Sequence, residues 1–241
     1  MNESVKWGSL TDRQKDEFTM YGNIEKIDWY FSDLNSAVNE NLYDEKTVNG
    51  YLNRIKNREQ GDSYGWTDTW LYDVLDRHDI KNQKVAIMGS IKPWYEAVCI
   101  HFGGIPITIE YNVITPPDNR LKMVHINNAN KEPLFDAAFS ISSFEHDGLG
   151  RYGDPINPNG DFKAMRELKS IVKKDGLLFL AVPTGKDKLV WNAHRKYGKI
   201  RLPYLIDGWK LIDQEGFDER EFEKDTGQSG VYQPVFVLKN I

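Results

Sequence analysis

The sequence has only one cysteine, Cys99, among its 241 residues. An intrachain disulfide and a multi-cysteine zinc site are therefore excluded, and the composition is compatible with a reducing compartment. No apolar run approaches the roughly 20 residues that span a bilayer, and the first residues contain no apolar core of signal-peptide length. We therefore expect a cytoplasmic protein without membrane insertion.

The chain also lacks an excess of positive charge. It carries 31 Lys and Arg residues against 36 Asp and Glu, which gives a formal net charge of -5. This balance provides no general attraction to phosphate backbones or anionic membranes, so we do not expect a nucleic-acid partner. The proportions of 40% hydrophobic and 28% charged residues are typical of a globular protein, and the length suffices for a sizeable core.

Residues 1–80 are rich in Asp, Asn, Lys and aromatic side chains, and their apolar residues are spaced as in helices. One predicted helix includes Ile27, Tyr30, Phe31, Leu34 and Val38. A later apolar stripe predicts a helix that packs one face against the next layer, formed by Trp66, Trp70, Leu71, Val74 and Leu75. Core packing is the commoner role of such a stripe. The alternative is that Trp66, Trp70 and Tyr72 line a substrate pocket.

From Lys84 onward, short apolar runs alternate with helix-like segments. The apolar runs predict strands at 85–88, 106–111, 123–126, 135–141, 177–182, 209–212 and 232–238. Helices are expected at 93–98 and 161–172. This alternation predicts an α/β fold, namely a Rossmann-like, doubly wound, mostly parallel seven-stranded sheet with helices on both faces. We place that domain at residues 81–241 and interpret residues 1–80 as an N-terminal helical extension or lid.

The residues that follow the first two predicted strands are the first candidates for a site, because ligands of open parallel sheets bind beyond the carboxyl ends of the strands. Gly89 and Ser90 follow the first strand, with one glycine where a nucleotide-binding fingerprint has two or three. A simple tight turn is the alternative. Glu110 ends the second strand, at a spacing typical of a carboxylate that accepts hydrogen bonds from both ribose hydroxyls. An exposed strand-end acid without a ligand is its alternative.

The segment after the fourth predicted strand combines Glu145, His146, Asp147, Arg151 and Asp154 with three glycines. Such a composition is typical of a site loop and unsuited to a core. A histidine has an unperturbed pKa of about 6.5 and can act as a general base. The alternatives for His146 are a structural histidine and a divalent-metal ligand with Asp147 or Asp154 as oxygen partners.

A second polar segment follows the fifth predicted strand and runs from Trp191 to Arg201. His194 is expected over the same sheet edge as His146. Arg195 and Arg201 suit an anionic group of a substrate, because each guanidinium presents a fixed fork of N–H donors. Solvated surface residues are the alternative.

The order of these elements resembles the class I S-adenosylmethionine-dependent methyltransferases. The resemblance includes the polar turn from Asn127 to Leu134, the strand that begins Phe135-Asp136, and the Glu145-His146 after it. The helix, glycine turn and strand over 168–180 also resemble that superfamily.

Three longer blocks are similar to domain-of-unknown-function family 268. They are Gly89-Ser90 with the following Pro-Trp-Tyr-Glu, the Ser-Ser-Phe-Glu-His-Asp-Gly-Leu-Gly-Arg-Tyr-Gly-Asp-Pro block at 142–155, and the Trp-Asn-Ala-His-Arg-Lys-Tyr-Gly block at 191–198. The broader resemblance implies cofactor contacts from Gly89, Ser90, Glu110, Asn127, Asn128 and Ser143. Among these, Gly89 and Ser90 would approach the methionine part, Glu110 the ribose, and Asn127 or Asn128 the adenine edge. The sequence departs from the superfamily where Ile91-Lys92-Pro93 replaces the glycine-rich signature.

The resemblance implies transfer of a methyl group from S-adenosylmethionine to an oxygen of a small polar acceptor, such as a sugar or glycan precursor. We expect His146 as the base, His194 as the second candidate, and Asp147 as an orienting residue or metal ligand. The expected acceptor contacts are Glu145, Arg151, Asp154, Arg195 and Arg201. A divalent metal is possible, although no motif indicates one. The alternative is a non-catalytic or repurposed Rossmann-like domain that binds a nucleotide or nucleotide-sugar.

Overall fold

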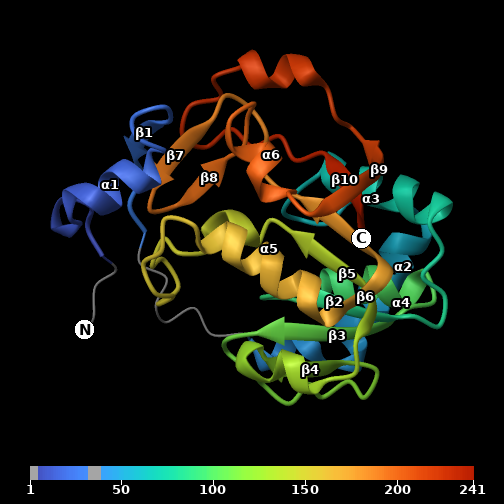
Figure 1. The fold of residues 1–241 in the computed structure, drawn as a ribbon. Helices are drawn as coiled ribbons and strands as arrows, with labels where there is room; N and C mark the ends of the chain where they lie inside the picture. Colours follow the sequence, from blue (N-terminus) through green and yellow to red (C-terminus); the bar gives the residue numbers. More distant parts are fainter. Residues whose placement is uncertain (1–4, 32–38) are drawn as a thin grey trace.

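The computed structural model describes residues 5–31 and 39–241, and a seven-stranded sheet in the order β4-β3-β2-β5-β6-β10-β9 forms its centre (Figure 1). Its strands are β2 (Lys84–Met88), β3 (Ile105–Glu110), β4 (Lys122–His125), β5 (Phe135–Ile141), β6 (Val172–Ala181), β9 (Trp209–Glu215) and β10 (Val235–Asn240). The pairs from β4 to β6 are parallel, and β10 runs antiparallel to β6 and β9. The predicted Rossmann-like sheet is therefore confirmed.

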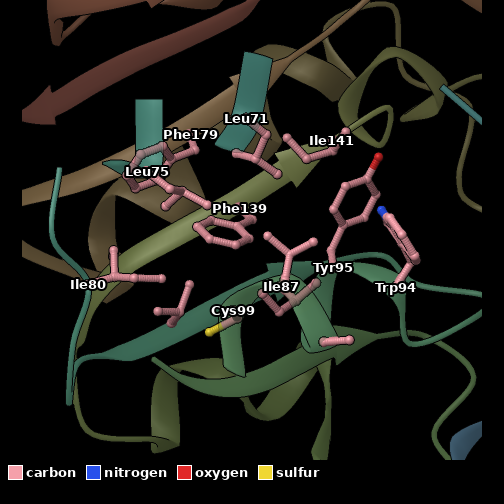
Figure 2. Close-up of a cluster of buried hydrophobic side chains, with 14 of the residues drawn as sticks. Leu71, Leu75, Ile80, Ile87, Trp94, Tyr95, Cys99, Phe139, Ile141 and Phe179 are labelled. Carbon is pink, nitrogen blue, oxygen red and sulfur yellow. The ribbon is translucent and has the colours of Figure 1, made fainter. Parts of the chain in front are cut away.

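Within the described residues, five α-helices flank this sheet, and the side chains of its strands divide between the two faces. The helices are α2 (Glu45–Lys56), α3 (Trp66–Arg77), α4 (Trp94–His101), α5 (Gly160–Ile171) and α6 (Arg201–Leu205). In β6, Phe179 joins the core under α2, α3 and α4, whereas Leu178 and Leu180 join the core under α5 and α6. Figure 2 shows the first core, where the rings of Phe139 and Phe179 meet edge to face with centroids 5.3 Å apart. A strand that is apolar on both faces is buried on both faces.

The predicted apolar stripe of α3 is buried only in part. Leu71, Val74 and Leu75 are buried in the first core, and Trp70 packs against Tyr232 with ring centroids 5.4 Å apart. The expectation for Trp66 is wrong, because this first residue of the helix is 65% exposed. The buried face of α3 instead begins with Thr67 and Asp68.

A second, three-stranded sheet lies at the left of the view in Figure 1, with α1 (Asp12–Phe18) against it. It consists of β1 (Glu25–Asp28), β7 (Lys188–Trp191) and β8 (His194–Lys196). The predicted helix through Ile27 is wrong, because Ile27 lies in β1 and pairs with Val190 in parallel. The expected helix positions Leu34 and Val38 fall outside the described residues.

Short 3-10 helices connect these elements, namely η1 (Trp7–Ser9), η2 (Glu40–Tyr43), η3 (Ile126–Lys131), η4 (Phe144–His146) and η5 (Glu219–Glu223). No helix in the described ranges is both long enough and apolar enough to cross a bilayer. The strand order reverses at β2, which pairs with β3 on one side and β5 on the other. Such a switch point is where ligands bind in open α/β sheets.

Candidate active site

A cavity of about 640 Å³ opens at the carboxyl ends of β2, β3 and β5. Its walls come from the turn after β2, the end of β3, η3, the loop after β5, and the N-terminal segment from Tyr51 to Asp68. The cavity therefore occupies the switch point of the sheet. Residues from both the sheet and the N-terminal extension reach it.

The turn after β2 needs glycine at position 89. Gly89 has a φ of +66°, and a Cβ there would lie 2.9 Å from Ser143 Oγ. Its N–H donates to the Ile109 carbonyl over 3.1 Å, which joins the turn to β3. Because any side chain would be strained and would crowd Ser143, this single glycine lets the backbone approach a ligand closely.

Glu110 ends β3 with its carboxylate at the wall of the cavity. Its Oε2 accepts the Ser90 N–H over 3.1 Å, and its Oε1 accepts the Tyr111 N–H over 2.7 Å. An ionised carboxylate has about four acceptor sites. Both oxygens can therefore accept further hydrogen bonds, as a vicinal diol requires.

The two asparagines of η3 differ in their positions. Asn127 lines the cavity, and its N–H donates to His125 Nδ1 over 3.1 Å. Asn128 is not among the described lining residues, and its Oδ1 accepts the Lys131 ammonium over 2.8 Å. Of the two candidates for the adenine edge, the structure places Asn127 at the cavity.

His146 ends η4 and lines the cavity with a defined tautomer. Its Nδ1 lies 2.6 Å from the Ala193 carbonyl oxygen, which can only accept, so Nδ1 carries the proton and Nε2 has a free lone pair. Burial and the nearby Arg151 lower the pKa of His146 to about 3. The imidazole is therefore neutral at physiological pH, with Nε2 as a hydrogen-bond acceptor.

Three acids accompany His146. Glu145 is 1% exposed and is not among the described lining residues. Its Oε1 accepts a hydrogen bond from the Ser142 hydroxyl over 2.5 Å, and burial raises its pKa to about 7. Asp147 lines the cavity, and burial raises its pKa well above the usual value, with Asp154 contributing. Asp154 accepts the N–H groups of Gly148 and Gly150 over 2.7 and 3.1 Å. Asp154 thus shapes the loop as well as lining the cavity.

Arg195 and Arg201 are buried under the loop after β5, each 2% exposed, and this corrects their expected role as acceptor contacts. Arg201 forms a two-pronged ion pair with Asp161 over 2.7 and 2.9 Å. Arg195 donates to the Asp147 carbonyl over 2.6 Å and lies 3.8 Å from the Asp161 carboxylate. The N–H donors of both guanidinium groups are used by backbone carbonyls and by the buried Asp161, so they are not available to an anionic group of a substrate.

His194 and Arg151 also lie elsewhere than expected. His194 belongs to β8 of the small sheet, is 7% exposed, and does not appear among the described residues of the cavity wall. Its ring lies near Trp29, with centroids 6.1 Å apart, and burial lowers its pKa to about 4. Arg151 donates to the Ala193 carbonyl over 3.2 Å, the same oxygen that accepts from His146. Arg151 therefore lies behind His146, outside the described lining.

The sequence prediction missed the aromatic wall of the cavity. Tyr51, Tyr64 and Tyr95 line it together with Asp68, whose Oδ1 accepts the Tyr95 hydroxyl over 3.0 Å. The rings of Tyr64 and Tyr95 are stacked with centroids 6.5 Å apart. By contrast, the three aromatic candidates of α3 lie outside the described lining, and Tyr72 is fully buried in the core. The function of the N-terminal extension as a lid stays a prediction.

Within residues 5–31 and 39–241, no group of three His, Cys, Asp or Glu side chains is arranged to hold a metal ion.

The fold is that of the class I methyltransferases, with the cavity at the switch point of a seven-stranded sheet. The chain belongs to the family described as "Caenorhabditis protein of unknown function, DUF268", whose model matches residues 82–229. No curated protein matches the chain.

Two solved methyltransferase structures are among those that match the chain. A 1,6-didemethyltoxoflavin-N1-methyltransferase from Burkholderia thailandensis, solved with bound 1,6-didemethyltoxoflavin and S-adenosylhomocysteine, superposes with a TM-score of 0.55 at 14% identity, covering 80% of this chain and 86% of that one. The N-methyltransferase NodS from Bradyrhizobium japonicum gives 0.46 at 12% identity, covering 71% and 92%. At these identities the likeness concerns the fold alone.

Proposed function

We propose that this chain transfers a methyl group from S-adenosylmethionine to an oxygen of a small polar acceptor, such as a sugar or glycan precursor. The observation that carries the proposal is the meeting of Gly89, Glu110 and His146 in one cavity at the switch point. The reaction needs a backbone turn that approaches the cofactor closely, a carboxylate that accepts hydrogen bonds from the ribose diol, and a base with a free lone pair.

The residues at the cavity fit the cofactor. Gly89 leaves space that a Cβ would fill, Glu110 has acceptor capacity for the ribose diol, and Asn127 supplies an amide for the adenine edge. Ser143, whose hydroxyl lies against Gly89, would contact the methionine part. The bound cofactor would supply a methyl group already activated by its sulfonium. The protein must then orient the acceptor and take its proton.

His146 is suited to receive that proton. As the acceptor oxygen bonds to the methyl group, its O–H bond breaks and the proton passes to Nε2, while Nδ1–H remains bonded to Ala193. A hydroxyl that is being alkylated becomes strongly acidic, so a weak base suffices. A base that is neutral over the whole physiological range also avoids repulsion of a positively charged cofactor.

The charges around the cavity support a neutral, hydroxyl-bearing acceptor. Arg195 and Arg201 are withdrawn from it, and the two lysines of its wall pair with acids: Lys92 with Asp62 over 3.6 Å and Lys163 with Glu167 over 3.2 Å. Aromatic faces and carboxylates remain as contacts. Apolar ring faces and acceptor-only groups suit the C–H and O–H groups of a sugar.

Replacing Glu110 by alanine is expected to weaken S-adenosylhomocysteine binding at least tenfold, because the ribose hydroxyls lose their acceptor. Calorimetric titration of the unmodified chain should give a micromolar Kd, about -8 kcal/mol. Glu132→Ala, which removes an acid paired with Lys122 outside the described lining, should leave this affinity unchanged.

No heat and no thermal shift with either S-adenosylmethionine or S-adenosylhomocysteine would overturn the proposal. Binding of both cofactor forms without methyl transfer to any sugar or small polar acceptor would favour a repurposed, non-catalytic domain. The acceptor screen therefore follows the titration and measures transfer of a labelled methyl group.

A further inference from the structure

Four buried side chains lie in and behind the turn after β2, where the sequence lacks the glycine-rich signature. Tyr43, Ser90, Glu96 and Thr108 are 0%, 8%, 0% and 2% exposed. They come from η2, the turn itself, α4 and β3. Three of them lie outside the elements that the sequence marked as a site, and Tyr43 belongs to the N-terminal extension.

Hydrogen bonds connect this group to the cofactor side of the turn. The Tyr43 hydroxyl donates to the Ser90 carbonyl over 2.8 Å, and the Thr108 hydroxyl donates to Glu96 Oε1 over 2.6 Å. Ser90 Oγ lies 2.9 Å from the Lys92 carbonyl and 3.1 Å from Glu96 Oε2. The Ser90 N–H in turn donates to Glu110 Oε2. The group thus reaches the carboxylate proposed to hold the ribose.

Counting the protons in this network favours a protonated Glu96. The Lys92 carbonyl can only accept, so the single proton of the Ser90 hydroxyl is used there. The contact between Ser90 Oγ and Glu96 Oε2 has a proton of its own when Glu96 is protonated, and it otherwise shares the Ser90 proton with the Lys92 carbonyl. The Tyr43 hydroxyl also lies 3.1 Å from Ser90 Oγ, so the network has six contacts. With Glu96 protonated, five protons serve these contacts, and only the Tyr43 proton is shared between two acceptors. An ionised Glu96 would compete with Lys92 for the Ser90 proton.

The surroundings of Glu96 favour its neutral form. Burial raises its pKa to about 7, against the lowering effect of its hydrogen bonds with Thr108 and Ser90, and Glu110 of β3 raises it further. The other titratable groups coupled to it are Tyr43 of η2, Tyr51 of α2 and Cys99 of α4. These groups supply no positive charge to stabilise an ionised carboxylate.

We propose that Tyr43 and protonated Glu96 are positioning residues that hold Ser90 and Glu110 in the geometry that binds S-adenosylmethionine. The inference rests on the proposed function, because it names residues that act through the same cofactor site. It makes the N-terminal extension part of that site. It also explains how one glycine suffices, since side-chain hydrogen bonds fix the turn that close glycine packing fixes elsewhere.

Affinity for S-adenosylhomocysteine should therefore depend on the protonation of Glu96. If only the protonated form binds, the apparent affinity falls by the protonated fraction, which predicts about tenfold weaker binding at pH 8 than at pH 6. Glu96→Gln is expected to bind equally at both pH values, because its amide donates to Ser90 Oγ and accepts from Thr108. Glu96→Ala should bind weakly at both. Calorimetric titration of the three proteins measures these differences.

Tyr43→Phe should weaken binding about five- to tenfold, since the Ser90 carbonyl loses its buried donor. Tyr72→Phe is the matched control: Tyr72 is equally buried in the N-terminal part, but its hydroxyl donates to the Glu59 carbonyl over 2.8 Å, away from the turn. Both variants should unfold at a lower temperature than the unmodified chain, but Tyr72→Phe should keep its affinity for S-adenosylhomocysteine. Equal losses of affinity in the two variants would overturn the inference.

A ligand-free measurement separates this inference from the proposed function. Because the folded pKa of Glu96 lies above the unfolded value, the unmodified chain should lose stability relative to Glu96→Gln as the pH rises from 5 to 7. The difference between their thermal midpoints should level off only above about pH 8, where Glu96 is ionised in the folded state as well. If this trend appears but S-adenosylhomocysteine does not bind, the proposed function fails while the protonated network stands. Equal pH dependence of the two proteins, in stability or in binding, overturns the inference.

Discussion

Replacing His146 by alanine is expected to lower the rate of methyl transfer by about 10²- to 10⁴-fold, the usual contribution of a positioned base. Affinity for S-adenosylhomocysteine should change little, because the proposed role of Nε2 is to take the proton of the methyl acceptor and not to bind the cofactor. Single-turnover rates with labelled cofactor, set beside calorimetric affinities, measure the two effects separately. Unchanged turnover in this variant would remove His146 from the reaction.

His194→Ala provides the comparison for this variant. Both histidines were candidates in the sequence, but His194 belongs to the small sheet and lies outside the described lining of the cavity. Its removal should change the rate of the folded enzyme only severalfold, after correction for the folded fraction. Because the pKa of His146 is about 3, its titration should leave no acidic limb near pH 6.5 in the rate profile. Such a limb, lost in His146→Ala, would contradict the lowered pKa of His146.

The main sheet could be predicted because its strands carry their own signal. The run from Leu177 to Val182 is apolar at consecutive positions, which marks a strand covered on both faces, and β6 is such a strand. The small sheet has no comparable signal. In β8, His194, Arg195 and Lys196 are charged or polar yet buried, and this burial is possible only through distant acceptors. Lys196, for example, donates to the carbonyls of Gly227 and Gly230.

The same physical reason limits the prediction of the candidate site. Gly89 directly follows β2, Glu110 ends β3, and Asn127 and His146 lie in the short segments after β4 and β5, so the sheet topology brings them together. From the sequence alone, Arg195 and Arg201 could equally contact a substrate or form buried structural ion pairs, because the sequence does not show their partners. The aromatic wall and Tyr43 come from the N-terminal extension, whose place over the cavity follows from tertiary packing. A run such as Leu189-Val190-Trp191 was the one local signal that could have revealed β7.

The second large effect is expected at Asp161, in the first turn of α5. Asp161→Ala should lower the free energy of unfolding by about 3–5 kcal/mol, because it leaves the buried guanidinium groups of Arg195 and Arg201 without their carboxylate. Urea denaturation measures the loss. Glu167→Ala in the same helix removes an acid that is 59% exposed and paired with Lys163, and it should cost no more than about 0.5 kcal/mol.

The contribution of Asp161 to the free energy of unfolding should depend on pH. Burial raises the pKa of Asp161, but Arg195 and Arg201 outweigh it and hold the pKa below its usual value. A carboxyl whose folded pKa is depressed stabilises the protein above its unfolded pKa of about 3.9, and the contribution is lost as the pH falls through the folded pKa. Asp161→Asn should therefore flatten the acid side of the stability curve.

A double variant shows whether Asp161 acts through its ion pair. Asp161→Asn with Arg201→Gln should lose less stability than the two single variants combined, because each single change strands the partner. Additive losses, or a loss below about 1 kcal/mol for Asp161→Ala, would contradict this account. Arg195 also holds the Asp147 carbonyl, and Arg201 the Pro158 carbonyl, so the pair anchors both ends of the loop that bears Asp147 and Asp154. Loosening it should therefore reduce turnover in the variant molecules that remain folded.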